Sequence, residues 1–300
     1  MTTSRAKRPR EAAICDMPSA LTGKRILVTR PRAQAAELCD QLGALGAQPV
    51  LFPTIEIAPM DDYTALDNAI RALSHYHWVI FTSVNGVATF WERLDLVGAG
   101  FIPAQLAAIG PATARALEGR GVRPNLIPDE YVAEAILDKI GEVSGRWILM
   151  PRADIAREAL ASELSRRGAV VHEIAAYRTL PAAPDPHGLA ELRRGVDAIT
   201  FTSSSTVRNF VRLVSGGDKY VDAANIRRTG RDGVPMPSLN RAAIACIGPV
   251  TAQTAREAGL PVDVMAREYT MDGLVAALAA YFSQPEYQLK ENRWIPARSL

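Results

Sequence analysis

Apolar and polar positions along the chain alternate between strand-sized apolar runs and segments with apolar residues at helical spacing. Residues 24–30 form an apolar run of strand length that ends at Pro31, and residues 34–43 place their apolar side chains at helical spacing. Residues 50–57 are again strand-like. The same order returns over residues 146–177. Strands alternating with helices of this size predict parallel βαβ units, and hence doubly wound α/β lobes.

The pattern repeats in register, which indicates an internal duplication. Ile148 lies 122 positions after Ile26, and the Phe-Thr-Ser sequences at 81–83 and 201–203 lie 120 positions apart. The Gly-Pro sequences at 110 and 248 lie 138 positions apart, because the second copy has an insertion between residues 215 and 241, before its Gly-Pro strand. The Gly, Arg and Pro content of this insertion predicts a long disordered loop.

Two short motifs recur where predicted strands end. Each Phe-Thr-Ser sequence leads into a helical pattern, and each Gly-Pro-x-Thr-Ala sequence, at 110–114 and 248–252, does the same after a short apolar run. Short predicted strands at 125–128 and 262–265 and helices at 132–140 and 271–282 follow. Because ligands of open parallel sheets bind at the carboxyl ends of strands, the four motifs predict an anion site made of hydroxyls and helix-start amides.

The hydroxyl candidates are Ser83 with Asn85, Thr113, Ser203 with Ser204, and Thr251. For any single Ser or Thr, a helix N-cap that stabilises the helix by about 1 kcal/mol is the favoured interpretation. Four such ends, two in each copy, favour the anion site.

Arginines and one tyrosine add charge and proton chemistry. Arg30 and Arg32 flank Pro31 after the first strand, and Arg152 holds the matching place in the second copy. A guanidinium there can bind carboxylate or phosphate through two hydrogen bonds, or be an ordinary surface charge. Tyr177 ends the apolar segment before Arg178 and is a candidate proton donor, with a packing role as the alternative.

Composition excludes several classes of function. The chain is 48% hydrophobic and 22% charged with a net charge of +2, which is typical of a globular enzyme and indicates neither nucleic acid nor a membrane as partner. Phosphate-loop, dinucleotide and nucleophile-elbow motifs are missing. The three cysteines lack a CxxC pair, and His75 and His77 lack a third ligand, so we expect no metal and a reducing cytoplasm.

The two ends of the chain differ from its centre. Residues 1–19 contain four basic residues without a signal-peptide core and predict a disordered basic arm, with a transit peptide or a nucleic-acid arm as alternatives. Residues 285–300 have weak periodicity and predict a peripheral tail. No apolar run approaches the roughly 20 residues of a membrane span.

The order of these motifs resembles the uroporphyrinogen-III synthase family. The resemblance rests on VTRP near residue 30, FTSVNGV, IGPATARAL, EIAAYRT and the final IGPVTAQTAREAGL with YTMDGLVAAL, and it covers about residues 22–282. No one motif is diagnostic, but their order and number are specific.

The resemblance implies two flavodoxin-like lobes joined by a two-stranded hinge. Carried onto this chain, residues 22–52 and 178–284 make one discontinuous lobe, and residues 53–177 make the other with the hinge strands. The arm then covers residues 1–21 and the tail 285–300. The repeat alone would divide the chain near Gly145.

The resemblance also implies a reaction: cyclisation of hydroxymethylbilane to uroporphyrinogen III with loss of water and inversion of the last pyrrole ring. It implies a monomeric lyase without a cofactor. Tyr177 matches the family's suggested proton donor, and Ser83, Thr113, Ser203 and Thr251 match its cleft hydroxyls. A non-catalytic two-lobed polyanion-binding protein and a nucleic-acid-binding protein acting through the basic arm are the alternatives.

Overall fold

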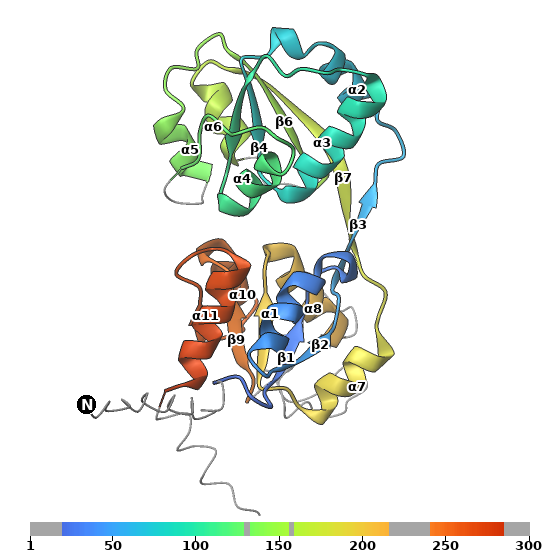
Figure 1. Ribbon diagram of the computed structural model, residues 1–300, viewed down its shortest axis with the longest axis vertical. Coiled ribbons are helices and arrows are strands. Elements are labelled where there is room, and N and C mark those ends of the chain that lie inside the picture. The colour runs from blue at the N-terminus through green and yellow to red at the C-terminus, as the bar shows by residue number, and fades with distance from the viewer. Residues whose placement is uncertain (1–19, 129–132, 156–158, 216–240, 285–300) are drawn as a thin grey trace, which may run out of the picture.

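Two five-stranded sheets, one in each lobe, organise the chain (Figure 1). The computed structural model describes residues 20–128, 133–155, 159–215 and 241–284. The first sheet is entirely parallel and has the order β10 (Val264–Met265), β9 (Ala243–Cys246), β8 (Ala198–Phe201), β1 (Arg25–Val28) and β2 (Gln48–Leu51). The second has the order β3 (Ile55–Pro59), β7 (Val170–Pro181), β6 (Trp147–Ala153), β4 (Trp78–Phe81) and β5 (Gln105–Ala108).

In the second sheet β3 runs antiparallel to β7, and the other pairs are parallel. Apart from β3, the neighbours β7, β6, β4 and β5 repeat the relation of β2, β1, β8 and β9 in the first sheet. The predicted pair of doubly wound lobes with an internal duplication is confirmed.

Helices cover both faces of each sheet. The first lobe contains a short 3₁₀ turn, η1 (Arg32–Gln34), and the helices α1 (Ala36–Ala44), α7 (Pro186–Arg194), α8 (Ser204–Ser215), α10 (Pro249–Glu257) and α11 (Met271–Phe282). The second contains α2 (Thr64–Arg71), η2 (Leu73–His75), α3 (Val84–Val97), α4 (Pro111–Glu118), α5 (Ala133–Lys139) and α6 (Ala159–Arg166). Figure 1 shows the two lobes one above the other, with β3 and β7 running between them.

Alternate residues of the buried strands point to opposite faces of each sheet, so each lobe has two hydrophobic cores, one on each face. In β1, Leu27 packs with the apolar faces of α7, α8 and α10, whereas Ile26 and Val28 pack with α1 and α11. Continuous apolar strands such as β8, in which every residue is buried, are expected when helices cover both faces of a parallel sheet. The second lobe likewise places α2, α3 and α4 on one face and α5 and α6 on the other.

The structure corrects two predicted strands. Residues 50–57 are not one strand, because the chain leaves the first sheet after Leu51 and enters the second at Ile55. Pro53 has no amide hydrogen for a ladder, and the Thr54 hydroxyl reaches the carbonyls of Thr29 (3.2 Å) and Thr206 (3.1 Å) instead.

Residues 125–128 form only an isolated bridge, between Leu126 and Ala107. Pro128 has no amide hydrogen to continue the ladder, whereas Ala266, at the matching place of the first lobe, donates to the Cys246 carbonyl at 3.1 Å beside β10.

The structure does not test the predictions made for the two ends of the chain, for the insertion or for the lobe boundaries. The basic arm up to residue 19, the insertion at 216–240 and the tail at 285–300 lie outside the described residues. The lobe boundaries at 52/53 and 177/178 stay predictions. Within the described ranges, every helix falls short of the length and apolar character needed to cross a bilayer.

Candidate active site

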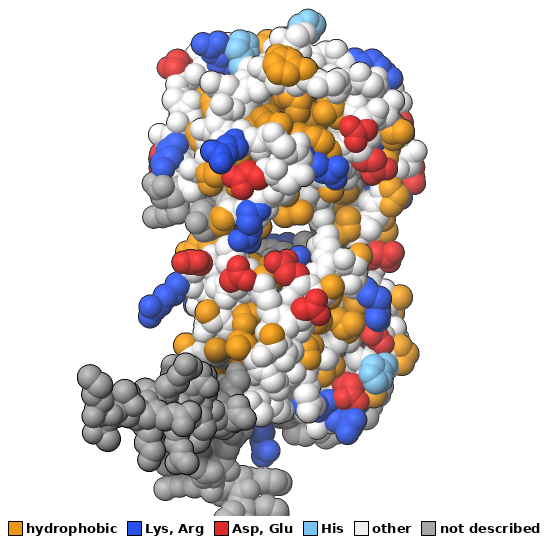
Figure 2. Space-filling view, in the orientation of Figure 1, with side chains coloured by type: hydrophobic (Ala, Val, Ile, Leu, Met, Phe, Trp, Pro, Cys, Tyr) orange, Lys and Arg blue, Asp and Glu red, His pale blue; other side chains and the backbone are white. Residues whose placement is uncertain are grey.

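The carboxyl ends of the two sheets face each other across a cleft. Gln34, just after β1, donates from Nε2 to Oδ1 of Asn85, just after β4, at 2.5 Å. Arg115 of α4 lies 3.9 Å from a carboxylate oxygen of Asp272 at the start of α11. Figure 2 shows an opening between the lobes, with basic and acidic side chains facing one another across it. The predicted strand-end residues therefore belong to two opposed rims.

Ser83 and Tyr177 meet at the rim of the second lobe. Ser83 is the N-cap of α3, and its Oγ accepts from the Gly86 amide at 3.0 Å. The same Oγ accepts from the Tyr177 hydroxyl at 2.9 Å. Tyr177 on β7 is only 7% exposed, whereas Ser83 is half-buried. Since Ser83 Oγ accepts twice, its own hydrogen is directed at neither partner and is available to the cleft.

The surroundings of Tyr177 act on its pKa in opposite directions. Burial is the largest influence and raises the pKa of the phenol, while hydrogen bonds with Ser83 and Asn85 lower it. Nearby charges contribute less: the carboxylate of Asp154 raises the pKa and the guanidinium of Arg152 lowers it. The hydroxyl therefore keeps its proton at neutral pH, with groups beside it that stabilise the phenolate.

Arg152 lies on β6, and 6% of it is exposed. Its guanidinium forms an ion pair with Glu173 of β7. Arg152 thus lies on the strand beside that of Tyr177, where the register pairs its neighbour Ala153 with Tyr177, and its charge lowers the pKa of the phenol.

The corresponding rim of the first lobe is built differently. Ser203 Oγ accepts from the Thr206 amide at 3.2 Å, and Thr206 Oγ1 donates to the Ser203 carbonyl at 2.7 Å. Ser204 Oγ lies 2.8 Å from Oγ1 of Thr254 in α10. The helix-cap interpretation therefore applies to both Phe-Thr-Ser ends, but only Ser83 is also bonded to a phenol.

The Gly-Pro ends leave the first turns of their helices open. Gly110 and Gly248, the N-caps of α4 and α10, provide no side-chain cap, and the proline that follows each one has no amide hydrogen. Thr113 and Thr251 are 4% and 5% exposed, and their hydroxyls bond to no other residue of the described chain. Uncapped first-turn amides and helix dipoles favour an anion at both places.

Arg30 and Arg32 diverge after β1. The Arg30 guanidinium is largely buried, donates from Nε to the Gln34 carbonyl at 3.0 Å, and lies 3.2 Å from the Met271 sulfur. Burial lowers the pKa of Arg30, and within the described ranges it forms no ion pair with a carboxylate. Arg32 is exposed and pairs with Asp185, the N-cap of α7, at 3.3 Å.

Arg32 and Gln34 line a pocket of about 560 Å³ beside the hinge, together with Pro53, Ile57 and Asp185. Arg32 thus lies at the hinge side of the cleft and does not reach Tyr177. Its predicted role in substrate binding stays a prediction, as do those of the other strand-end residues.

Two functional candidates are not foreseen from the sequence. The periodicity places Gln34 at the start of a helix, and only the opposed lobes bring it to Asn85. Asp154 follows Arg152 after β6 and accepts from the Thr179 amide at 3.0 Å, while its own amide donates to the Tyr177 carbonyl at 3.0 Å. The sequence does contain one signal for Asp154. It follows a predicted strand at the place that Arg32, a predicted site residue, holds in the first copy.

The histidines contribute no metal site within the described residues. No group of three or more His, Cys, Asp or Glu side chains there is arranged to hold an ion. The His77 ring accepts from the Trp147 amide at 3.1 Å, which fits the predicted surface or cap role.

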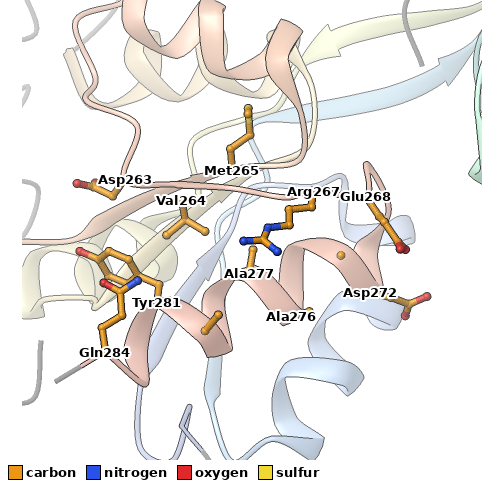
Figure 3. A pocket seen from close by; sticks show the side chains of 12 residues that line it. Asp263, Val264, Met265, Arg267, Glu268, Asp272, Ala276, Ala277, Tyr281 and Gln284 are labelled. Atoms are coloured by element: carbon orange, nitrogen blue, oxygen red, sulfur yellow. The ribbon is translucent and has the colours of Figure 1, made fainter. Parts of the chain in front are cut away.

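A further pocket of about 600 Å³ runs along α11 and β10 of the first lobe (Figure 3). Its floor is small and apolar, with Ala276 and Ala277, and Asp263 lies near one end and Glu268 and Asp272 near the other. Three carboxylates facing one arginine make it a poor site for a polyanion. The groups that suit an anion are therefore the uncapped helix-start amides and the hydroxyls at the strand ends of the cleft.

Comparison with known proteins identifies relatives over most of the chain. The family model of uroporphyrinogen-III synthase HemD matches residues 36–276. A uroporphyrinogen-III synthase of Synechococcus elongatus is 35% identical over 88% of this chain and 97% of its own length. A putative uroporphyrinogen-III synthase of Methanothermobacter thermautotrophicus is 30% identical over 84% of this chain and 96% of its own.

A solved structure has the same fold. A mutant uroporphyrinogen III synthase from the extreme thermophile Thermus thermophilus aligns with a TM-score of 0.60 at 23% identity, covering 86% of this chain and 98% of that one. At this identity the likeness extends to the two-lobed architecture alone.

Proposed function

The chain belongs to the uroporphyrinogen-III synthase family, and we propose that it closes hydroxymethylbilane to uroporphyrinogen III in the cleft between its lobes. Members of this family are cyclising lyases of tetrapyrrole biosynthesis. The observation that supports a site in this cleft is the bond from Tyr177 to Ser83, in the lobe that also contains the uncapped start of α4 and opposite the lobe that contains that of α10.

The rims bind the carboxylate arms of the substrate. The open first turns of α4 and α10, with the unbonded hydroxyls of Thr113 and Thr251, lie on opposite lobes and hold different arms of one flexible polyanion. Backbone amides at helix starts attract negative charge without the mobility of long side chains. Binding at two lobes brings the ends of the linear substrate together, which is the positioning that ring closure needs.

Departure of the substrate hydroxyl requires a proton. Tyr177 is too buried to meet the substrate directly, so Ser83 donates its hydrogen to the leaving oxygen while accepting the Tyr177 proton over 2.9 Å. The carbon–oxygen bond breaks, water leaves, and the electron pair of the pyrrole nitrogen gives an azafulvene. Asn85 and Arg152 stabilise the phenolate that Tyr177 briefly becomes.

Positioning governs the remaining steps. The substituted carbon of the last pyrrole attacks the azafulvene to form a spiro intermediate, one carbon–carbon bond then breaks, and the ring recloses with that pyrrole inverted. The final loss of a proton from carbon balances the proton given to water and returns the phenolate to a phenol. These steps use the substrate's own electron density, so a fixed electrostatic environment is the main contribution of the protein.

The isomer formed from fresh hydroxymethylbilane tests the proposal. Left alone, the substrate closes without inversion to uroporphyrinogen I, so we expect the protein to divert it to uroporphyrinogen III, with heat-denatured protein as the control. Formation of the I isomer alone would contradict the proposal and favour a non-catalytic polyanion-binding protein.

We further propose a monomer in the cytoplasm that acts on this small-molecule substrate without a cofactor, a nucleic acid or a membrane as partner. The free thiols of Cys39 and Cys246 suit a reducing compartment, and burial raises the pKa of Cys246 to about 12, which keeps it protonated. Sedimentation of the purified chain checks the oligomeric state.

A further inference from the structure

A directed series of hydrogen bonds joins the first lobe to Tyr177. Arg30 donates from a terminal nitrogen to Gln34 Oε1 at 3.5 Å and from Nε to the Gln34 carbonyl at 3.0 Å. Gln34 Nε2 donates across the cleft to Asn85 Oδ1 at 2.5 Å. Asn85 in turn lies close enough to the Tyr177 phenol to lower its pKa, and the Tyr177 hydroxyl donates to Ser83 Oγ at 2.9 Å.

Each residue in this series donates to the next one, from Arg30 toward Ser83. Because Arg30 can only donate, it fixes the carbonyl of the Gln34 amide toward itself and leaves the NH₂ group for Asn85. The Asn85 carbonyl is then occupied by Gln34, so its NH₂ group is the one left to stabilise the phenolate of Tyr177. Each bond polarises the next, and the series begins at a cation and ends at the proton that Ser83 receives.

The series is complete only when the lobes are close. Gln34 lies in η1 of the first lobe, whereas Asn85 and Tyr177 belong to elements of the second. If the lobes separate, Asn85 loses the partner that fixes its orientation, and either end of its amide can then face the phenol. A second contact between the lobes, from Arg115 to Asp272, joins two exposed side chains, and within the described ranges neither residue forms a hydrogen bond or ion pair that leads to Tyr177.

We propose that Gln34 is a positioning residue that makes proton donation conditional on lobe closure. With the lobes apart, the Tyr177 proton is held; with the lobes closed on substrate, Gln34 orients Asn85 to stabilise the phenolate. The reactive azafulvene then forms only where the cleft can direct its ring closure. This inference rests on the proposed role of Tyr177 as proton source.

Two substitutions at Gln34 separate orientation from simple attachment of the lobes. Gln34→Ala removes the contact. Gln34→Glu keeps its length and its ability to reach Asn85, but a carboxylate can only accept, so Asn85 turns its NH₂ group toward Glu and its carbonyl toward the phenol. Gln34 is half-buried on the surface of η1, so we expect both variants to fold, which circular dichroism checks.

The test measures kcat and KM for both variants, each made in the wild-type chain and in the Tyr177→Phe chain. We expect Gln34→Ala and Gln34→Glu each to lower kcat about tenfold with less than a threefold change in KM. In the Tyr177→Phe chain the same changes should alter kcat less than twofold, because the group they act on is gone. Arg115→Gln, which removes the ion pair with Asp272 across the cleft, should lower kcat by the same factor in both chains if it acts at all.

The outcomes distinguish the two proposals. Equal losses from Gln34→Ala in both chains, or full activity of Gln34→Glu, would show that Gln34 only attaches the lobes and would overturn the inference while leaving the Tyr177 role intact. Wild-type turnover of Tyr177→Phe itself would instead overturn the proton-source role and the inference together.

Discussion

The two lobes are copies of one another, yet only the second places a phenol against the serine that caps its Phe-Thr-Ser helix. Ser83 and Ser203 occupy matching places and both cap their helices. Ser83 also accepts from Tyr177, whereas Ser203 bonds only within the first turn of α8. The offset of 122 residues that relates Ile26 to Ile148 pairs Tyr177 with Ile55, an apolar residue that is 6% exposed.

Under the proposed function, both lobes bind the substrate and one of them supplies the proton. Both copies keep the open Gly-Pro helix starts that suit carboxylates, with Thr113 in one and Thr251 in the other. A substrate with eight carboxylate arms can use both. A single proton is needed for a single leaving group, so one phenol in one lobe is sufficient.

The largest effect is expected when the phenol is removed. Tyr177→Phe keeps the ring in its packed site but deletes the proton, and we expect kcat to fall about a hundredfold, the lower end of what general acids contribute. Steady-state turnover of hydroxymethylbilane measures it. Tyr76→Phe is the matched control, since Tyr76 is equally buried and bonds to His172 (2.7 Å) in the same lobe, outside the cleft.

If Tyr177→Phe turned over like the wild type, the lobes would be equivalent in chemistry as well as in fold. Equal losses in Tyr177→Phe and Tyr76→Phe would point to damage of the second lobe in general.

A smaller, shared effect is expected at the two Gly-Pro ends. Thr113→Val and Thr251→Val replace each hydroxyl by a methyl group of similar size, and we expect KM to rise by up to about tenfold, or about 1.4 kcal/mol, in each. Inhibition by a polycarboxylate product, measured alongside KM, should weaken in parallel. A loss confined to one lobe would mean that the substrate does not bridge the cleft.

The smallest effect concerns the stability of the second lobe apart from its chemistry. Two hydrogen bonds from Arg93, at 2.6 and 2.8 Å, hold the pKa of the Asp67 carboxyl below its ordinary value. A lowered pKa in the folded state stabilises the fold fully above the ordinary pKa of the carboxyl, and this stability is lost as the pH falls from there through the lowered pKa.

We expect Asp67→Asn to lower the free energy of unfolding by about 1 kcal/mol at pH 7 and by little near pH 3. Urea denaturation at the two pH values measures it. We expect this variant to keep full kcat, because the Asp67–Arg93 pair stabilises the second lobe without taking part in proton donation. A loss of kcat comparable to that of Tyr177→Phe would contradict this separation of stability and chemistry.

Much of the fold could be predicted from sequence because its signals are local. Apolar runs of strand length, Gly-Pro helix starts and the repeated register identified both lobes, and α11 has the predicted bounds, Met271–Phe282. The prediction missed the break between β2 and β3 because residues 50–57 are apolar on both sides of it, although Pro53 is a signal against one continuous strand. What separates the two strands is the set of distant carbonyls that receive the Thr54 hydroxyl.

The site could be predicted in its parts but not in its connections. Residue types at strand ends indicated Ser83, Asn85 and Tyr177, and the structure brings these three together. Gln34 depends on how two lobes meet, and Arg32 is drawn toward Asp185 by an ion pair across 153 positions of sequence. Neither leaves a periodic or local signal.

The most direct test of the account replaces the matching serines, one lobe at a time. Ser83→Ala and Ser203→Ala each remove a helix cap, so both should lose about 1 kcal/mol of stability. Only Ser83→Ala should lower kcat, by about tenfold, whereas Ser203→Ala should affect KM and leave kcat within about twofold. The result that would contradict the account is an equal loss of kcat in the two variants, because the proton would then not leave through the second lobe.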